Sequence, residues 1–224
     1  MQRYFLDLNN QISKDDTHHI INVMRFKSGT EVELCKEGMC YLADLVIHDK
    51  MVSFELKEKL SICPMLNITI VQGLPKGDKL ETVTKYATLF NAKSILFMPM
   101  KRSIAKVSNA SFKLERLHKI SKEAAELSKR SFLPFIDFID SINKINLKNK
   151  VLLILDEAEK ENLLGEVVKL YKNEEIVAVI GPEGGIDDEE RLLFKSLNAV
   201  FVSLGELILP TELAHIPLLN AFSL

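Results

Sequence analysis

The chain of 224 residues has no tryptophan, only three cysteines, and no apolar run that reaches the ~18 residues of a membrane-spanning helix. Residues 1–7 lack the apolar core and small-residue cleavage site of a secretory signal. The cysteines, Cys35, Cys40 and Cys63, are odd in number and form no C-x-x-C pair. The sequence therefore predicts reduced thiols in a cytoplasmic protein without a membrane partner.

Motifs for several common chemistries are also missing. Neither the dinucleotide fingerprint G-x-G-x-x-G nor the phosphate loop G-x-x-x-x-G-K-[ST] occurs, and no Ser or Cys nucleophile motif is visible. The pair His18-His19 offers no third ligand at metal spacing, and the other histidines are scattered. We therefore expect neither a Rossmann-type cofactor site nor a metal site.

Charge is distributed unevenly along the chain, although the net charge is only −2. Residues 76–150 carry 16 Lys and Arg against 7 Asp and Glu, whereas residues 151–224 carry 5 against 14. This asymmetry suggests a nucleic-acid contact surface in the basic part. A solvated, lysine-rich helix face explains the charge about as well.

Two regions with different patterns follow one another. Residues 1–66 alternate short strand candidates with turn signals, which predicts a small β-rich, barrel-like domain with one helix that Asp15 or Asp16 caps and that runs to Met24. The strands expected there are Arg3–Leu8, Glu31–Cys35, Met39–Ile47 and Met51–Leu60.

From residue 67 onward strands and helices alternate, which predicts an α/β domain with a mostly parallel sheet and helices on both faces. Pro217 falls inside the last expected helix, where it should kink the chain or cost ~3 kcal/mol. The expected strands are Ile68–Gly73, Ser94–Met98, Val151–Leu155, Glu175–Ile180 and Ala199–Leu204. The expected helices are Lys79–Phe90, Asn109–Arg130, Glu159–Tyr171, Asp188–Leu197 and Thr211–Phe222.

The expected helix over residues 109–130 is amphipathic. Its periodicity places an apolar stripe against the core and leaves most of its Lys and Arg residues off that stripe. Lys101 and Arg102 add positive charge just before the helix, and phosphate contacts from such clusters give affinity without sequence readout. The stripe comprises Leu117, Ile120, Ala124 and Leu127.

The stretch from Ile180 to Ile186 is the strongest single signal, because three glycines and a proline let the main chain turn sharply and approach a ligand. Asp187 and Glu190 then have the spacing of a helix capping box. The segment therefore reads as a strand, a tight turn and a helix in succession, which fits a binding loop at the carboxyl end of a strand. An ordinary strand-to-helix connection fits the spacing equally well.

Six separated segments carry a resemblance to one known family: Arg3-Tyr4-Phe5, His18–Arg25, Leu74–Lys79, Glu123–Arg130, Val179–Gly185 and Leu204–Glu212. Together they resemble the SPOUT-class methyltransferases of the small-subunit ribosomal RNA uridine-N3 family. The resemblance covers nearly the whole chain in the expected order.

The resemblance implies an N-terminal PUA-like RNA-binding barrel over residues 1–66 and a C-terminal knotted α/β methyltransferase domain over residues 67–224. It also implies a homodimer, S-adenosylmethionine as cofactor, and ribosomal RNA or the small ribosomal subunit as partner. Arg130 and Glu212 are the implied catalytic residues. The implied RNA-binding residues are Arg3, Arg25, Lys27, Lys101 and Arg102. The implied cofactor-binding residues are Leu155, Gly181, Pro182, Glu183, Gly184, Gly185, Leu204, Gly205, Ile208 and Leu209.

The chain departs from the family pattern at two places. In the basic helix, Leu127 and Lys129 stand where the family has Gln and Gly before the arginine; the other departure is in a turn near the C-terminus. The family has arginines at the positions of Leu207 and Pro210, in a turn that reads roughly R-I-L-R-T-E-T-A. Two hypotheses for the function therefore remain. The chain is either an active uridine-N3 methyltransferase, or an RNA-binding or ribosome-binding homologue that keeps the fold without catalysis.

Overall fold

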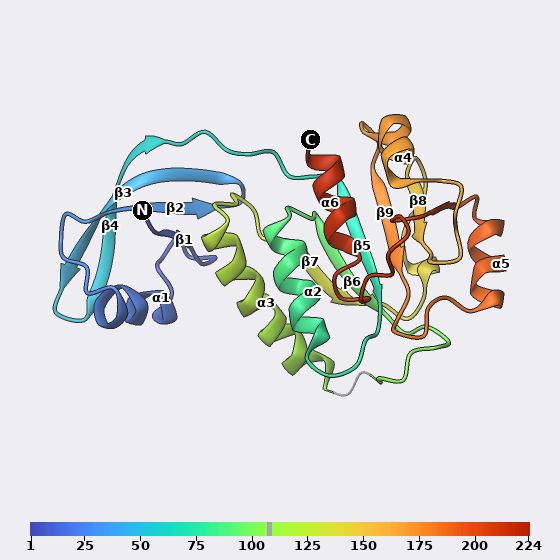
Figure 1. Ribbon diagram of the computed structural model, residues 1–224. Helices are drawn as coiled ribbons and strands as arrows, with labels where there is room; N and C mark the ends of the chain where they lie inside the picture. Colours follow the sequence, from blue (N-terminus) through green and yellow to red (C-terminus); the bar gives the residue numbers. More distant parts are fainter. Residues whose placement is uncertain (107–108) are drawn as a thin grey trace. The chain divides into compact units, whose positions relative to one another are not determined.

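The computed structural model describes residues 1–106 and 109–224 (Figure 1). It divides into two compact units. The first comprises residues 1–64 and 122–133, and the second comprises residues 65–121 and 134–224. Helix α3 (Ala110–Leu127) contributes residues to both.

The first unit is built on a four-stranded sheet in the order β1-β2-β3-β4. Strand β1 runs parallel to β2, and the other neighbours are antiparallel. Inward-facing Tyr4, Leu34 and Leu45 are buried and pack with Ile20 from the helical segment. The strands are β1 (Arg3–Phe5), β2 (Glu31–Lys36), β3 (Met39–His48) and β4 (Met51–Lys59), close to those expected from sequence.

The helical segment of this unit consists of α1 (Lys14–His18) and a π-helical turn, η1 (His19–Val23). Its N-cap is Ser13, whose Oγ accepts a hydrogen bond from the Asp16 main-chain nitrogen at 3.1 Å. The expectation of an aspartate cap was wrong, because Asp16 is instead buried and pairs with Lys122 at 2.5 Å.

The prediction of reduced thiols was also wrong for two of the three cysteines. Cys35 and Cys40 form a disulfide, and only Cys63 is free among the described cysteines. The β2–β3 register places Cys35 directly opposite Cys40, with 4.1 Å between their Cα atoms. Sequence spacing could not show that pairing, because it depends on where the hairpin turns.

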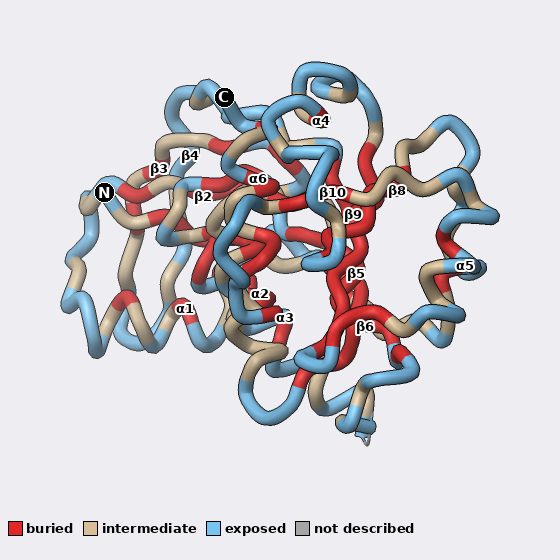
Figure 2. Tube along the Cα trace, turned by 45° about the vertical axis from the view of Figure 1, so that its right-hand side comes forward, coloured by how far each residue is buried: buried red, intermediate tan, exposed pale blue. Residues whose placement is uncertain are grey.

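The second unit contains a six-stranded, entirely parallel sheet in the order β10-β8-β9-β5-β6-β7. Figure 2 shows the central strands β5 and β9 buried along their length, as expected for a sheet covered on both faces. The strands are β5 (Ile68–Gly73), β6 (Ser94–Met98), β7 (Phe135–Phe138), β8 (Val151–Leu155), β9 (Ile176–Ile180) and β10 (Val200–Val202). The mostly parallel α/β sheet predicted from sequence is confirmed, with β7 as an unexpected edge strand.

Helices cover the two faces of this sheet unequally. Buried residues of α2 (Lys79–Leu89), α3, α4 (Leu164–Tyr171) and α6 (His215–Ser223) share one apolar cluster with Ile68 and Ile70. Residues of α5 (Asp188–Ser196) and of the 3-10 helix η2 (Ile142–Lys144) pack on the opposite face, against Val71 and Leu96. No helix in residues 1–106 or 109–224 is both long and apolar enough to cross a membrane.

Several helix predictions need correction. Helix α6 begins at His215 rather than Thr211, so Pro217 lies in its first turn, where a missing N–H leaves no intrahelical bond unmade and no kink is needed. Helix α4 begins at Leu164 rather than Glu159, because the Glu159 carboxylate accepts main-chain bonds from Glu161 and Asn162 and holds a turn there. Leu127 is 72% exposed at the last residue of α3, and Ala125 takes the buried place.

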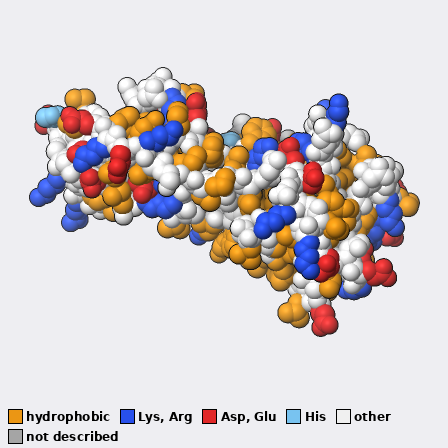
Figure 3. All heavy atoms as spheres, turned by 90° about the horizontal axis from the view of Figure 1, so that it is seen from above, with side chains coloured by type: hydrophobic (Ala, Val, Ile, Leu, Met, Phe, Trp, Pro, Cys, Tyr) orange, Lys and Arg blue, Asp and Glu red, His pale blue; other side chains and the backbone are white. Residues whose placement is uncertain are grey.

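Ion pairs within the second unit join the basic residues 76–150 to the acidic residues 151–224. Lys93 and Lys150 both pair with Glu175, at 3.0 and 3.1 Å, and Lys101 pairs with Glu189. On the face shown in Figure 3, Lys and Arg side chains are interspersed with Asp and Glu side chains. Contacts inside the fold therefore neutralise part of the positive charge of residues 76–150 and part of the negative charge of residues 151–224.

Candidate functional site

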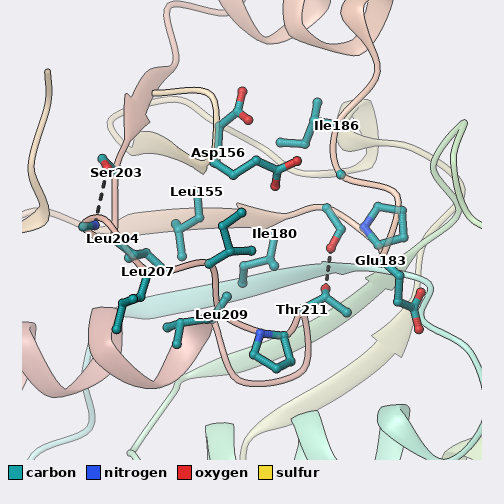
Figure 4. Close-up of a pocket in the computed structure, with 18 of the residues that line it drawn as sticks. Leu155, Asp156, Ile180, Glu183, Ile186, Ser203, Leu204, Leu207, Leu209 and Thr211 are labelled. Atoms are coloured by element: carbon teal, nitrogen blue, oxygen red, sulfur yellow. Dashed lines mark hydrogen bonds between the residues drawn. The ribbon is translucent and has the colours of Figure 1, made fainter. Parts of the chain in front are cut away.

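A cavity of about 450 Å³ lies in the second unit, where the neighbouring strands β10, β8 and β9 end. Figure 4 shows Leu155, Ile180 and Leu209 around a common space, with Asp156 and Thr211 on opposite sides of it. Three loops after these strands supply nearly all of the lining, and α2 adds Lys79. The carboxyl edge of a parallel sheet is where α/β proteins bind ligands.

The first wall is the loop between β9 and α5, residues 181–187. A Cβ atom on Gly181 would lie 3.0 Å from the Gly185 carbonyl carbon, so the absence of a side chain there lets the main chain fold back on itself without a tight contact. Gly185 has φ +72°, a conformation that favours glycine. The capping box that closes the loop is confirmed, since Asp187 and Glu190 make both reciprocal bonds.

The second wall is the loop between β10 and α6. The side chains of Leu207 and Ile208 are 82% and 79% exposed, whereas Thr211 is 9% exposed. The Thr211 hydroxyl donates a 2.5 Å hydrogen bond to the Gly181 carbonyl oxygen. The two loops are therefore joined directly at the base of the cavity.

A salt-bridge cluster fixes one rim of the cavity. Lys79 Nζ lies 3.1 Å from Glu183 and 3.0 Å from Glu212, and the Lys76 main-chain nitrogen donates to Glu183 at 3.0 Å. The hydrogen bond to Glu212 is the main cause that raises the pKa of Lys79. Burial alone would raise the pKa of Glu183, but the bonds from Lys76 and Lys79 hold it below its usual value. Sequence analysis gave Lys79 no role, because neither partner is near it in the chain.

A second charged pair lies behind the β8–α4 loop. Asp156 is 5% exposed, and Arg191 of α5 donates to both of its carboxylate oxygens, at 2.6 and 2.9 Å. Burial would raise the pKa of Asp156, but the hydrogen bonds from Arg191 and from the Ala158 nitrogen lower it overall. The bidentate pair keeps a carboxylate charged at the cavity, and no local motif signals it.

Most of the residues predicted to bind the cofactor come together. Gly184 does not line the cavity; its carbonyl oxygen accepts a 3.0 Å hydrogen bond from Arg102. Glu212 reaches the site through Lys79. The predicted residues that line the cavity are Leu155, Gly181, Pro182, Glu183, Gly185, Leu204, Gly205, Ile208 and Leu209.

Lys101 and Arg102, predicted to bind RNA, lie in the β6–α3 connection beside the glycine loop. The Lys101 main-chain nitrogen donates to Glu190 at 2.9 Å, and the Arg102 side chain reaches Gly184 and, at 3.7 Å, Asp187. Both residues thus support the start of α5. Their side chains are about half exposed, and RNA contact by them stays a prediction.

The other predicted RNA-binding or catalytic cations belong to the first unit. Arg25 and Lys27 are exposed. Arg3 is 6% exposed, and its guanidinium bonds Glu33 at 2.9 Å and the Arg130 carbonyl oxygen at 2.9 Å. Arg130 is 5% exposed, and burial lowers its pKa to about 10. The functional roles of these four residues stay predictions.

No group of three or more potential metal ligands occurs in the part of the chain that the structure describes. The lining combines apolar side chains, main-chain groups of two glycine-containing turns and a few charged side chains, such as Asp156 and Lys79. Such a lining suits a small organic ligand held by its shape and by main-chain hydrogen bonds.

Comparisons with known proteins show the family to which the chain belongs. Residues 63–223 match the model of a family described as the RNA methyltransferase domain. Ribosomal RNA small subunit methyltransferase E of Bacillus subtilis (strain 168) is 32% identical over 100% of this chain and 96% of its own length.

Two solved structures are similar over nearly the whole chain. One, a hypothetical protein, has 31% identity and a TM-score of 0.84, with 99% of this chain and 97% of the other covered. The other is ribosomal RNA small subunit methyltransferase E from Neisseria gonorrhoeae bound to S-adenosyl methionine. It has 24% identity and a TM-score of 0.82, with 100% and 96% covered, so that it supports the fold alone.

Proposed function

Because this chain belongs to the RNA methyltransferase domain family, we propose that it transfers the methyl group of S-adenosylmethionine to uridine N3 in small-subunit ribosomal RNA. The observation that carries the proposal is the cavity between the two turns at residues 181–185 and 204–209. The full-length match to an enzyme named for small-subunit ribosomal RNA methylation supports the substrate class.

The cavity fits the proposed cofactor. Side chains at Gly181 and Gly185 would fill the turn, so the main chain there is bare and can contact a ligand. Leu155, Ile180 and Leu209 supply apolar surface for a flat ring, and Asp156 and Glu157 supply carboxylates. S-adenosylmethionine carries an electrophilic methyl group on a positively charged sulfur, so a nucleophilic ring nitrogen needs no metal to accept it.

The remaining work of the protein is to position the base and to favour its anion. Uridine N3 must lose its imide proton before or during attack, so positive charge near the base lowers the barrier. Among the described residues that line the cavity, Lys79 and Lys160 are the cations, and Lys79 is held between two carboxylates.

The architecture implied by the resemblance forms part of the same proposal. The turns at residues 181–185 and 204–209 would belong to a trefoil knot, and the first unit would be a PUA-like barrel that binds RNA. The compact first unit, residues 1–64 with 122–133, supports a domain boundary near residue 66. A cytoplasmic homodimer completes the proposal.

The test is methyl transfer to small-subunit ribosomal RNA by the purified protein, with calorimetric titration of S-adenosylmethionine. Gly185→Val should weaken cofactor binding roughly tenfold, because a side chain at φ +72° is strained by about 1–2 kcal/mol. Gly165→Val is the control, since nothing lies within 4 Å of a Cβ atom there. A wild-type protein that binds no S-adenosylmethionine would end the proposal.

A second candidate function is RNA binding without catalysis. The observation that favours it is that Leu207 and Pro210 line the cavity where the family pattern has arginines. The double variant Leu207→Arg with Pro210→Arg separates the two functions: activity gained from an inactive wild type supports the second, whereas an already active wild type refutes it.

A further inference from the structure

Gln72 is a buried polar residue that does not line the cavity. Sequence analysis assigned it no role. It is the fifth residue of β5 and is 0% exposed. A buried amide is costly unless its hydrogen bonds are made, so its partners indicate what it does in the fold.

The partners of Gln72 belong to the two loops that wall the cavity. Its Nε2 lies 2.7 Å from the Thr211 hydroxyl and 3.2 Å from the Gly181 carbonyl oxygen. The Thr211 hydroxyl also donates to that carbonyl oxygen. The three groups form a closed triangle that joins β5, the β9–α5 loop and the β10–α6 loop.

The orientation of the amide is fixed by its surroundings. Both Gly181 and Gly73 present carbonyl oxygens, at 3.2 and 3.1 Å from Nε2, and a carbonyl oxygen can only accept. The nitrogen must therefore face the loops. The Gln72 Oε1 atom is buried with no hydrogen-bond partner among the described residues, a cost that the three contacts of the nitrogen offset.

We propose that Gln72 is the positioning residue that sets the spacing between the two cofactor-binding turns. It acts through Thr211 and the Gly181 carbonyl and does not touch the ligand itself. The inference rests on the proposed function, because it assumes that S-adenosylmethionine occupies the cavity between these turns.

The experiment is a double-mutant cycle with Gln72→Met and Thr211→Val, both near the native volume. Each single variant should weaken S-adenosylmethionine binding roughly tenfold, and the double variant should bind no worse than about the same level, because either change opens the same triangle. Thr211→Ser keeps the hydroxyl and should retain affinity. Thr84→Val is the matched control: Thr84 is also fully buried, but its hydroxyl bonds Leu80 in α2, away from the cavity.

A second readout does not need the cofactor. In Gln72→Met without ligand, amide hydrogen exchange should accelerate in peptides that cover residues 181–186 and 204–211, and should be unchanged in β6. Unchanged exchange in these loops, wild-type affinity in Gln72→Met, or effects that multiply in the double variant would overturn the inference. If Gln72→Met does not fold, the comparison of Thr211→Val with Thr211→Ser decides.

A wild-type protein that fails to bind S-adenosylmethionine refutes the proposed function alone. The exchange measurement then still tests whether Gln72 holds the two loops together.

Discussion

The two units bury polar groups of different kinds. The first buries Arg3, Asp16 and Arg130, which are ionisable, and holds them with partners such as Glu33 and Lys122. The second buries mainly neutral groups inside its sheet and helices, including Gln72, Thr84 and His215. Its buried carboxylate, Asp156, lies at the carboxyl edge, where the cavity is.

The difference follows from the size of the cores. The first unit has a short sheet and two small apolar clusters, so ion pairs and a disulfide make up a larger part of what fixes its fold. The second unit has two apolar clusters on a six-stranded sheet and can leave the ends of its strands free for loops that bind a ligand. A rigid sheet with polar groups at one edge is a common basis for a precise site.

The largest effect that would separate the units is the pH dependence of the second unit. Burial lowers the pKa of His215 to about 4, and neither ring nitrogen has a hydrogen-bond partner among the described residues. In the unfolded chain the imidazole takes up a proton near pH 6.5, so stability should fall as pH drops from 6.5 towards 4, by roughly 3 kcal/mol in total.

Hydrogen exchange in β9 peptides measures this loss. His215→Leu should remove it, and His118→Leu, at an exposed histidine of α3, should leave it in place. An unchanged pH dependence in His215→Leu would show that the buried imidazole is not its source.

The first unit should respond to pH in the opposite direction, with a smaller effect. Burial raises the pKa of Glu126 to about 7; Lys122 opposes the shift, and the Asp16 carboxylate adds to it. Between about pH 4.5 and 7 the unfolded chain has lost this proton while the folded protein keeps it. Because Glu126 is only partly buried, solvent screening weakens the effect, and stability should fall by about 2 kcal/mol as pH rises through that range.

Exchange in β3 peptides reports on this unit. Glu126→Gln should flatten the profile between pH 5 and 8, and Glu58→Gln, at an exposed position of β4 in the same unit, should not. A first unit that gains stability towards pH 8 would contradict the prediction.

The sequence predicted the second unit well where local pattern decides structure. Strands β5, β6 and β8 were found to the residue, because each is an apolar run bounded by turn residues or charges. Strand β7 was missed: it is four residues long, follows Pro134, contains Asp137 and pairs only at the edge with β6. Thr211 was expected to begin the last helix, but it precedes α6 and its hydroxyl bonds Gly181, a contact across the fold that no local pattern shows.

In the candidate site too, the sequence indicated the local features and not the contacts between distant residues. The glycine loop and its capping box are local, and the sequence indicated both. The groups that hold the loops in place are not local: Gln72 and Thr211 are 139 positions apart, and Asp156 and Arg191 are 35 apart. The distribution of charge along the sequence also could not show these contacts, because Lys79 and Lys93 pair with carboxylates in residues 151–224.

The smallest expected effect comes from the disulfide of the first unit. Cys35 and Cys40 are only five positions apart, and the antiparallel β2–β3 register already places them opposite each other. The crosslink therefore removes little freedom from the unfolded chain, and Cys35→Ala with Cys40→Ala should cost the first unit at most about 2 kcal/mol while β9 exchange stays the same.

Alkylation of the denatured protein checks the pairing itself. One label, at Cys63, is expected before reduction and three after it. Three labels without reductant would restore the thiol state that the sequence predicted. The fold of the first unit would then depend on its ion pairs and small apolar core, which would make its contrast with the second unit sharper.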